Sequence, residues 1–335
     1  NKVMYLSASV LTYNGAAYIK KQLDSILTQT QKVDEIVICD DGSTDDTIAI
    51  IRAYQNNYPG TIHLYQNEVQ LGSTKNMEKC LGLVKGDIVF LADQDDSWLP
   101  NKVATLCSFF ETHPVVDAVF SNAVLINEKD AIIPELHLWD IIGFPEATIN
   151  STPNTIPNSK SNSTLNSEFN LFEFLYRVDN IVTGAGLAIR NHKALLTQPF
   201  PIVKGLLHDG WIALYYASQG KLAYCKDMLF QYRIHAAQQM GGNTTDPAGL
   251  LEMNQNVYAS IINTNSFVQT KAYWNRLEQN LRVQKGLVTT YQKIGVDTTA
   301  LRKKMETQLK DYYELGGAAY PVKTKLRSIK KRFGF

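Results

Sequence analysis

The sequence lacks a long apolar run and an excess of charge of either sign. No stretch of its 335 residues approaches the roughly 18–20 apolar residues needed to cross a bilayer. Its 33 Lys and Arg stand against 32 Asp and Glu, so the formal net charge is +1 and nothing points to nucleic acid as a partner. Asn1 does not open a charged segment followed by an apolar core, as a signal peptide would. We therefore expect a cytoplasmic protein.

Cysteine is also scarce. The four cysteines lie far apart, and most fall within apolar or helical patterns: Cys39, Cys80, Cys107 and Cys225. They predict buried free thiols in a reducing compartment, not a disulfide framework or a zinc site. A G-x-G-x-x-G sequence after the first expected strand is missing too, because Thr12-Tyr13-Asn14-Gly15 stands there. This argues against a dinucleotide-binding dehydrogenase.

The most informative feature present is a cluster of three carboxylates within four residues. Asp93, Asp95 and Asp96 directly follow the apolar run 87–92. Such a run predicts a buried strand that ends at a polar cleft. Crowded carboxylates repel one another and need a proton or a cation. Hard oxygen ligands suit Mg²⁺ or Mn²⁺, which keep positions open for substrate phosphates, whereas the alternative interpretation is a solvated acidic turn.

Two further strand ends carry polar residues. Asp40 and Asp41 follow the apolar run 35–39, where two adjacent carboxylates are placed to accept from a base N–H and a ribose hydroxyl. One Asp alone would be only a helix cap. Tyr13, in the turn after the first strand, could stack on a nucleobase or simply cover the sheet edge.

The first half of the chain alternates between strand and helix patterns. Strands are expected near 5–11, 34–39, 61–65, 87–92 and 116–121, with helices near 17–28, 45–56, 74–84 and 100–112. This alternation predicts an α/β fold with a mostly parallel sheet and helices on both faces. In such folds ligands bind beyond the carboxyl ends of the strands, where all three polar motifs fall.

These motifs together resemble a known family. The ordered matches are Thr12-Tyr13-Asn14-Gly15, 22–30, 40–45, 67–76, 93–100, His208-Asp209-Gly210-Trp211 and Tyr232-Arg233-Ile234-His235. Over about residues 3–240 the chain resembles the family 2 inverting, nucleotide-sugar-dependent glycosyltransferases of the A-type fold (GT-A). It looks most like the bacterial rhamnosyltransferase-like enzymes that build surface polysaccharide or decorate surface proteins.

The resemblance implies a function. It implies metal-dependent, inverting transfer of a sugar from a nucleotide-sugar, UDP-hexose or dTDP-rhamnose, to a hydroxyl of a glycan, glycoprotein or lipid-linked acceptor. Mn²⁺ or Mg²⁺ would be the metal. The alternative is a catalytically inactive, nucleotide-binding scaffold, against which the joint presence of Asp93, Asp95 and Asp209 argues. A sugar-nucleotide synthase would carry a Gly- and Arg-rich loop near the N-terminus, and a processive polymerase would carry membrane spans and Q-x-x-R-W.

The resemblance also assigns residues. Asp209 matches the catalytic base, which removes the acceptor proton; its alternative is a helix cap. The metal ligands would be Asp95, Asp93 and His235. Contacts to the donor would come from Thr12, Tyr13, Asn14, Asp40, Asp41, Lys75, Asp93, Arg233 and Gln238. The acceptor would be bordered by Trp98, Thr183, Gly184, His208 and Trp211.

Several of these residues have a second interpretation. Arg233 suits a diphosphate through its paired donors. His235, at a similar strand end, is either a ligand or a structural histidine. Lys75 is either a nucleotide contact or a solvated surface residue. Gly184 either admits a ligand close to the backbone or permits tight strand packing.

The remainder divides into two regions. Residues 1–245 are expected to form the catalytic domain, with 149–167 as a mobile polar loop that either touches the acceptor or is an inert insertion. Residues 246–335 show helical patterns and should form a C-terminal region that docks on the catalytic domain or mediates self-association. Its basic tail, 323–333, either contacts the inner face of the cell membrane or is a soluble basic end.

Overall fold

Strand and helix alternate through the first half of the computed structural model, which describes residues 4–144, 171–172, 175, 180–190, 192–197, 199–236, 238, 271–293, 297–299, 302–303, 305–306 and 309. The first elements are β1 (Leu6–Thr12), α1 (Ile19–Leu27), β2 (Glu35–Asp40), α2 (Thr47–Asn57), β3 (Ile62–Gln66), α3 (Ser73–Leu83), β4 (Ile88–Asp93), β5 (Ser97–Trp98) and α4 (Lys102–Thr112). The later ones are β6 (Ala118–Ile126), β7 (Ile132–His137), α5 (Leu138–Ile142), η1 (Gly184–Gly186), β8 (Leu187–Arg190), α7 (His192–Leu195), α8 (His208–Ser218), β9 (Leu222–Arg233) and α10 (Lys271–Lys293).

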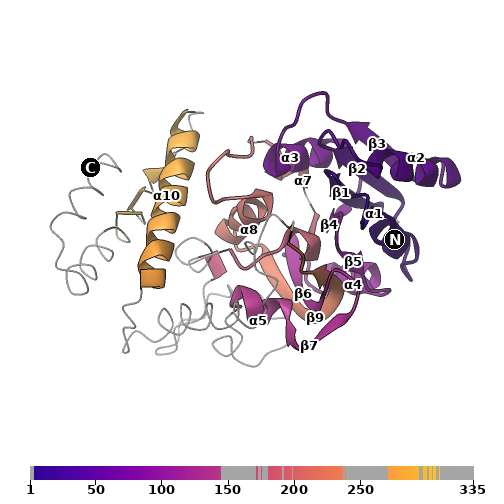
Figure 1. Ribbon diagram of the computed structural model, residues 1–335. Helices are drawn as coiled ribbons and strands as arrows, with labels where there is room; N and C mark the ends of the chain where they lie inside the picture. The colour runs from indigo at the N-terminus through magenta and orange to yellow at the C-terminus, as the bar shows by residue number, and fades with distance from the viewer. Residues whose placement is uncertain are drawn as a thin grey trace.

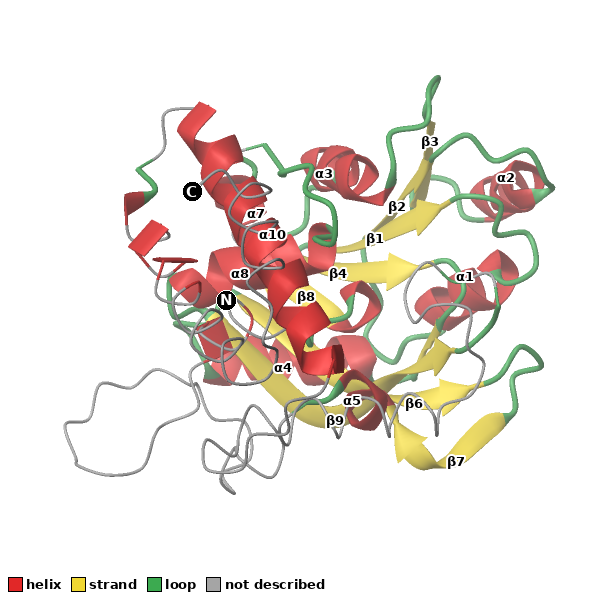
Figure 2. Cartoon of the chain, turned by 60° about the vertical axis from the view of Figure 1, so that its left-hand side comes forward, coloured by secondary structure: helices red, strands yellow, loops and turns green. Residues whose placement is uncertain are grey.

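One sheet organises these elements. Its strands lie in the order β3-β2-β1-β4-β8-β6-β9-β5, with β7 paired to β6. β1, β2, β3 and β4 are parallel, as are β6 and β9, whereas β8 runs antiparallel to both β4 and β6. Figure 2 shows helices on both sides of the strands, among them α3 and α4. The predicted α/β fold with a mostly parallel sheet and flanking helices is confirmed.

Burial explains why these segments form as they do. All seven residues of β1 are buried, as expected of a strand covered on both faces, and its polar Ser7, Ser9 and Thr12 are hydrogen-bonded inside the protein. Helix α1 instead buries one stripe, Ile19, Leu23 and Ile26, which recur at helical spacing. The described cysteines Cys39, Cys80, Cys107 and Cys225 are all free and buried, as predicted.

Two later elements carry the His208-Asp209-Gly210-Trp211 and Tyr232-Arg233-Ile234-His235 motifs. Helix α8 begins at His208, and polar His208 and Asp209 are buried in its first turn. Strand β9 runs from Leu222 to Arg233 and pairs with β6 along its length. The short strand β5 was not predicted, because two residues carry no periodicity.

The C-terminal helix α10 packs beside α8, against the part of the chain that forms the sheet and its flanking helices (Figure 1). Val283 and Leu287 of this helix join the main apolar core. A Cβ at Gly286 would lie only 2.6 Å from a methyl of Val203, so the helix approaches that loop at glycine distance. Among the described residues, no helix is both long enough and apolar enough to cross a membrane. The predicted loop 149–167 and basic tail 323–333 lie outside the described residues.

Candidate active site

Three strands deliver polar residues to one edge of the sheet. β1, β2 and β4 are parallel neighbours, and in their registers Thr12 lies beside Asp40 and Leu11 beside Asp93. Their carboxyl ends therefore form a common edge, as the alternation of strand and helix predicted. The turns that leave this edge carry the motifs singled out in the sequence.

Asp40 closes the turn after β2. Its buried carboxylate accepts hydrogen bonds from the Thr12 hydroxyl (2.8 Å) and from the amides of Gly42 (3.1 Å) and Ser43 (2.9 Å). Gly42 has a φ of +89°, a left-handed conformation that glycine adopts without strain. Both carboxylate oxygens are engaged within the protein. Asp40 and Thr12 organise the turn in this structure, and their predicted contacts with the donor stay predictions.

Asp41 is bound internally as well. Its carboxylate, 4% exposed, accepts from the side-chain amide of Asn67 (2.7 Å) and from the backbone amides of Leu71 (2.7 Å) and Gly72 (2.8 Å). These bonds fix the segment that leads from β3 into α3. The predicted contact of Asp41 with the donor is thus replaced in this structure by a bond to that segment.

The turn after β1 is held open toward solvent. The side chain of Gln94 accepts from the Tyr13 amide (2.8 Å) and donates to the Tyr13 carbonyl (2.9 Å). The side-chain oxygen of Asn14 accepts from the Thr44 amide (2.8 Å). A Cβ at Gly15 would lie 2.1 Å from the Gln94 oxygen, so this clamp requires glycine. The backbone is fixed, while the Tyr13 ring is 45% exposed and available for stacking.

Asp95 and His235 form a pair at the same edge. A carboxylate oxygen of Asp95 lies 2.8 Å from Nε2 of His235, although 140 residues separate the two in the sequence. The Asp95 side chain is 24% exposed, so this oxygen faces accessible space. One carboxylate and one imidazole are donors that suit Mn²⁺ and Mg²⁺ sites completed by substrate phosphates. The residues present therefore fit a divalent metal.

The third predicted metal ligand is not part of this pair. Among the described residues, no three His, Cys, Asp or Glu side chains converge on one point. Asp93 is half-buried, and its pKa is raised to about 6, first by burial and then by the charges of Asp95 and Asp209, which His208 opposes. The charges of Asp95 and Asp209 thus both act on Asp93. Among the described residues, however, Asp93 does not complete a three-ligand metal site with Asp95 and His235.

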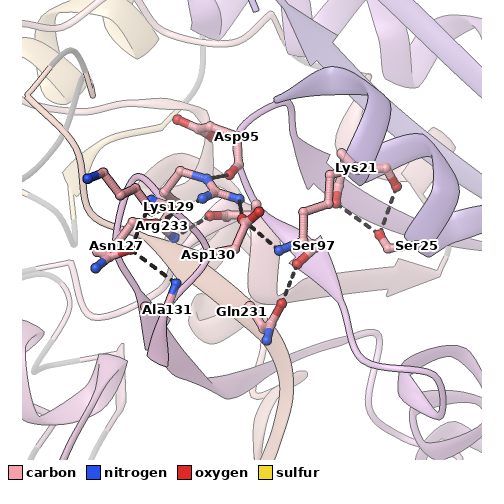
Figure 3. A network of polar contacts seen from close by, with 12 residues as sticks. Lys21, Ser25, Asp95, Ser97, Asn127, Lys129, Asp130, Ala131, Gln231 and Arg233 are labelled. Atoms are coloured by element: carbon pink, nitrogen blue, oxygen red, sulfur yellow. Dashed lines mark hydrogen bonds and ion pairs between the residues drawn. The ribbon is translucent and has the colours of Figure 1, made fainter. Parts of the chain in front are cut away.

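Arg233 has partners inside the protein. Its side chain is buried, and its guanidinium donates to the Asp95 carbonyl (2.6 Å) and the Asn127 carbonyl (2.9 Å) and pairs with Asp130 (2.6 Å) (Figure 3). The ring of Tyr18 lies 4.5 Å from the guanidinium carbon. Arg233 therefore joins the Asp95 loop to the β6–β7 turn, and its predicted contact with the diphosphate stays a prediction.

Lys75 and Gln238 are also engaged internally. Lys75 pairs with Glu78 (2.5 Å), whose other oxygen accepts from the Phe200 amide (2.9 Å). The side-chain oxygen of Gln238 accepts from the backbone N–H of His235 (3.0 Å). Neither side chain is placed here as the predicted donor contact. Gln238 supports the position of His235 instead.

Asp209 opens helix α8 and is 8% exposed. Burial raises the pKa of its carboxyl to about 6, while N–H groups of Gly210 and Gly184 and the side chain of Asn180 lower it. The Gly210 amide lies 2.6 Å from the carboxylate. A carboxylate with a pKa near neutrality, held by backbone donors, has the properties of a general base.

His208 and Gly184 lie against Asp209. A Cβ at Gly184 would be 2.9 Å from Nε2 of His208 and 3.8 Å from Cβ of Asp209. The ring of His208 is 6% exposed, and neither nitrogen has a hydrogen-bond partner within the described part of the chain. Burial lowers the pKa of His208, so the ring is neutral at neutral pH. The structure thus brings together three of the predicted residues, with Thr183 next in the chain.

The two tryptophans are largely buried. Trp98 is 4% exposed, and its ring packs against Phe90 and over the Lys102 ammonium. Trp211 is 6% exposed and lies near Phe200. Their predicted place beside the acceptor stays a prediction.

Sequence reasoning missed four residues of the site, Tyr18, Gln94, Lys102 and Asp130, and gave no role to Asp96, one of the three clustered carboxylates. Asp96 is buried, accepts from the Arg233 amide (2.8 Å), and burial raises its pKa well above the usual range. Asp130 has a φ of +67° in the β6–β7 turn. Only Tyr18 and Gln94 had a usable signal, since each lies within or beside a motif already identified.

The sequence matches a known protein family. Residues 7–170 match the model of glycosyl transferase family 2. An uncharacterized glycosyltransferase of Nostoc sp. is 30% identical over 240 residues, which are 70% of this chain and 66% of the relative. The UDP-Glc:alpha-D-GlcNAc-diphosphoundecaprenol beta-1,3-glucosyltransferase of Escherichia coli is 34% identical over 128 residues, 38% of this chain and 49% of the relative. The chain thus spans less than two thirds of these relatives.

Solved structures show the same fold. The crystal structure of S. aureus TarS in complex with UDP-GlcNAc has a TM-score of 0.52 at 18% identity, covering 93% of this chain and 81% of that chain. GalNAc-T7 with UDP, GalNAc and Mn²⁺ has a TM-score of 0.52 at 15% identity, covering 94% and 56%. At these identities the likeness shows the fold alone, and it confirms the predicted GT-A-type architecture.

Proposed function

The chain belongs to glycosyltransferase family 2, and on this premise we propose that it transfers a sugar, with inversion, from a nucleotide-sugar to an acceptor hydroxyl. The observation that carries the proposal is Asp209. A buried carboxylate with a pKa of about 6 lies near Asp93 and the Asp95–His235 pair at the carboxyl edge of the sheet. Inverting transfer needs one such base, acting on the face opposite the leaving group.

The donor would lie across the carboxyl edge. Asp95 and His235 would hold Mn²⁺ or Mg²⁺, which when bound neutralises the charge of the departing nucleoside diphosphate. Tyr13, exposed on a clamped backbone, would stack on the nucleobase. Asp93, half-buried near the Asp95 loop, would face the donor.

The acceptor would approach from the opposite side. Asp209 would accept the proton of its hydroxyl. The neutral ring of His208, with both nitrogens uncommitted among the described residues, would hydrogen-bond the bound sugar or acceptor. Thr183 and Gly184 would border the same space, because Gly184 contacts both His208 and Asp209.

The donor and the acceptor can be proposed by chemical class. The Escherichia coli relative is named for UDP-glucose and a diphosphoundecaprenol-linked acceptor. UDP-hexoses are therefore candidate donors, beside the dTDP-rhamnose that the rhamnosyltransferase-like motifs favour. A glycan, glycoprotein or lipid-linked hydroxyl would be the acceptor, in bacterial surface polysaccharide or glycoprotein synthesis. A lipid-linked acceptor would bring the protein to the inner face of the cell membrane.

A donor screen tests the proposal. UDP-glucose, UDP-galactose, UDP-N-acetylglucosamine and dTDP-rhamnose are each added with and without Mn²⁺. Thermal stabilisation reports binding, and release of the nucleoside diphosphate reports turnover. We expect one donor to give a Mn²⁺-dependent response in both measurements. Binding without turnover, in the presence of candidate acceptors, would support the inactive scaffold instead.

A further inference from the structure

Lys102 is a buried cation beneath the acidic edge, and the proposed chemistry makes no use of it. It is the first residue of α4, and its side chain is 0% exposed. Burying an ammonium is costly unless it is paired, and the positive end of the α4 dipole adds repulsion. A cation held in this position must therefore be stabilised by specific partners.

The partners of Lys102 come from three segments. Its ammonium donates to the carbonyl of Ala185 and lies 4.4 Å from the ring centre of Trp98 and 4.9 Å from that of Phe230. Trp98 and Phe230 are paired residues of β5 and β9. Burial lowers the pKa of Lys102 to about 7, while the charges of Asp96 and Asp93 raise it. The cation is thus enclosed by two rings, one carbonyl and nearby carboxylates.

The Ala185 carbonyl connects Lys102 to the proposed base. Ala185 is the middle residue of η1, whose first residue, Gly184, donates its N–H to the Asp209 carboxylate. The last residue, Gly186, approaches Phe230 so closely that a Cβ would lie 3.0 Å from the ring. A shift of η1 would therefore move a donor that holds the base.

We propose that Lys102 is a positioning residue, which fastens η1 to the β5–β9 pair and so fixes Asp209 relative to the Asp95 loop. The inference rests on the proposed function, because it takes Asp209 as the base. No hydrogen bond or ion pair joins Lys102 to Asp95 or His235 among the described residues. Its loss should therefore lower turnover and leave donor affinity largely unchanged.

The test is Lys102→Met in the full chain. Methionine keeps the length and the ring contacts but loses the bond to Ala185. We expect kcat of Mn²⁺-dependent donor turnover to fall about 10–100-fold, the cost of a small misplacement of reacting groups. The Kd of UDP with Mn²⁺, measured by calorimetry, should change by less than about threefold. Lys32→Met is the matched control, since Lys32 donates to the Leu27 carbonyl at the surface.

A second variant separates positioning from charge balance. Lys102→Met removes a positive charge that acts on the buried Asp96 carboxyl, and the double variant Lys102→Met/Asp96→Asn removes that carboxyl as well, so stability lost through this charge change should be restored. We expect the double variant to recover Tm but not kcat. Recovery of kcat, or an unchanged kcat in Lys102→Met, would overturn the proposal.

A third measurement does not depend on turnover. Amide hydrogen exchange at 183–187 should be at least about tenfold faster in Lys102→Met than in the wild type or in Lys32→Met, because η1 loses its buried tie. Unchanged exchange would overturn the inference even if no donor were found. An inactive wild-type chain with faster exchange in Lys102→Met would contradict the proposed function only.

Discussion

Replacing the proposed base should make the folded protein more stable. Burial raises the pKa of Asp209 from 3.8 to about 6, so the ionised carboxylate is unfavourable in the folded state. Each pKa unit corresponds to about 1.4 kcal/mol, which makes the penalty about 3 kcal/mol at high pH. Asp209→Asn removes the charge but weakens the bonds from Gly184 and Gly210. The expected net gain is about 1–3 kcal/mol.

The gain has a defined pH dependence. Because the folded-state pKa lies above the unfolded one, the folded wild type binds more protons between about pH 4 and 6. Its stability therefore falls as the pH rises through that window. Asp209→Asn has no such titration. The difference between the two proteins should be smallest near pH 4 and reach its full size above about pH 7.

Thermal unfolding at pH 4.5 and pH 8 measures this difference. At roughly 2 °C per kcal/mol, Asp209→Asn should raise Tm by about 2–6 °C at pH 8 and by much less at pH 4.5. Donor-dependent turnover should be lost in the same variant. A lower Tm at pH 8, or a difference that does not vary with pH, would refute the assignment of Asp209 as a buried, destabilising carboxylate.

The proposed base, the buried Arg233 and the packing of α10 can each be tested separately. Wild-type kcat/KM at saturating Mn²⁺ should decline below about pH 6, as Asp209 becomes protonated; a wild-type profile flat to pH 5 would contradict the base assignment. Arg233→Met should cost about 2–4 kcal/mol in urea unfolding, because it removes the buried guanidinium that bonds the Asp95 and Asn127 carbonyls, with exposed Arg52→Met near neutral; normal stability with lost donor binding would support the diphosphate assignment. Gly286→Ala should lower the free energy of unfolding by about 1–3 kcal/mol, because its Cβ would collide with Val203. Gly82→Ala, in open space on α3, should raise the free energy of unfolding. Equal effects of the two substitutions would contradict the close packing of α10 on Val203.

Local patterns predicted the edge of the sheet well. Apolar runs that end in acids placed Asp40 and Asp93 at the same edge of the sheet, on the two strands that flank β1, because parallel strands share one carboxyl edge. The sequence also pointed to Asp95 and His235, which the fold then brings within 2.8 Å. Such features depend on strand direction and burial, which apolar periodicity specifies directly.

The direction of individual side chains could not be predicted in the same way. Arg233 at the end of β9 could face either a diphosphate or the protein interior, and its partner Asp130 lies in a turn about which local sequence says nothing. Nothing in the sequence around Trp98 predicts that its ring packs over the Lys102 ammonium. The turn hydrogen bonds to the Asp40 carboxylate are likewise not visible from residue type alone. Sequence patterns miss such contacts because the tertiary structure decides which groups a polar side chain bonds.

The most direct test of the account is the stereochemistry of the product. A single base acting opposite the leaving group requires one displacement, so the configuration at the anomeric carbon must invert. The active donor is supplied with Mn²⁺, and the first-formed product is followed by proton NMR in the wild type and in Asp209→Asn. We predict an anomeric configuration opposite to that of the donor, and no product with Asp209→Asn. Retained configuration, or undiminished turnover in the variant, would contradict the central claim.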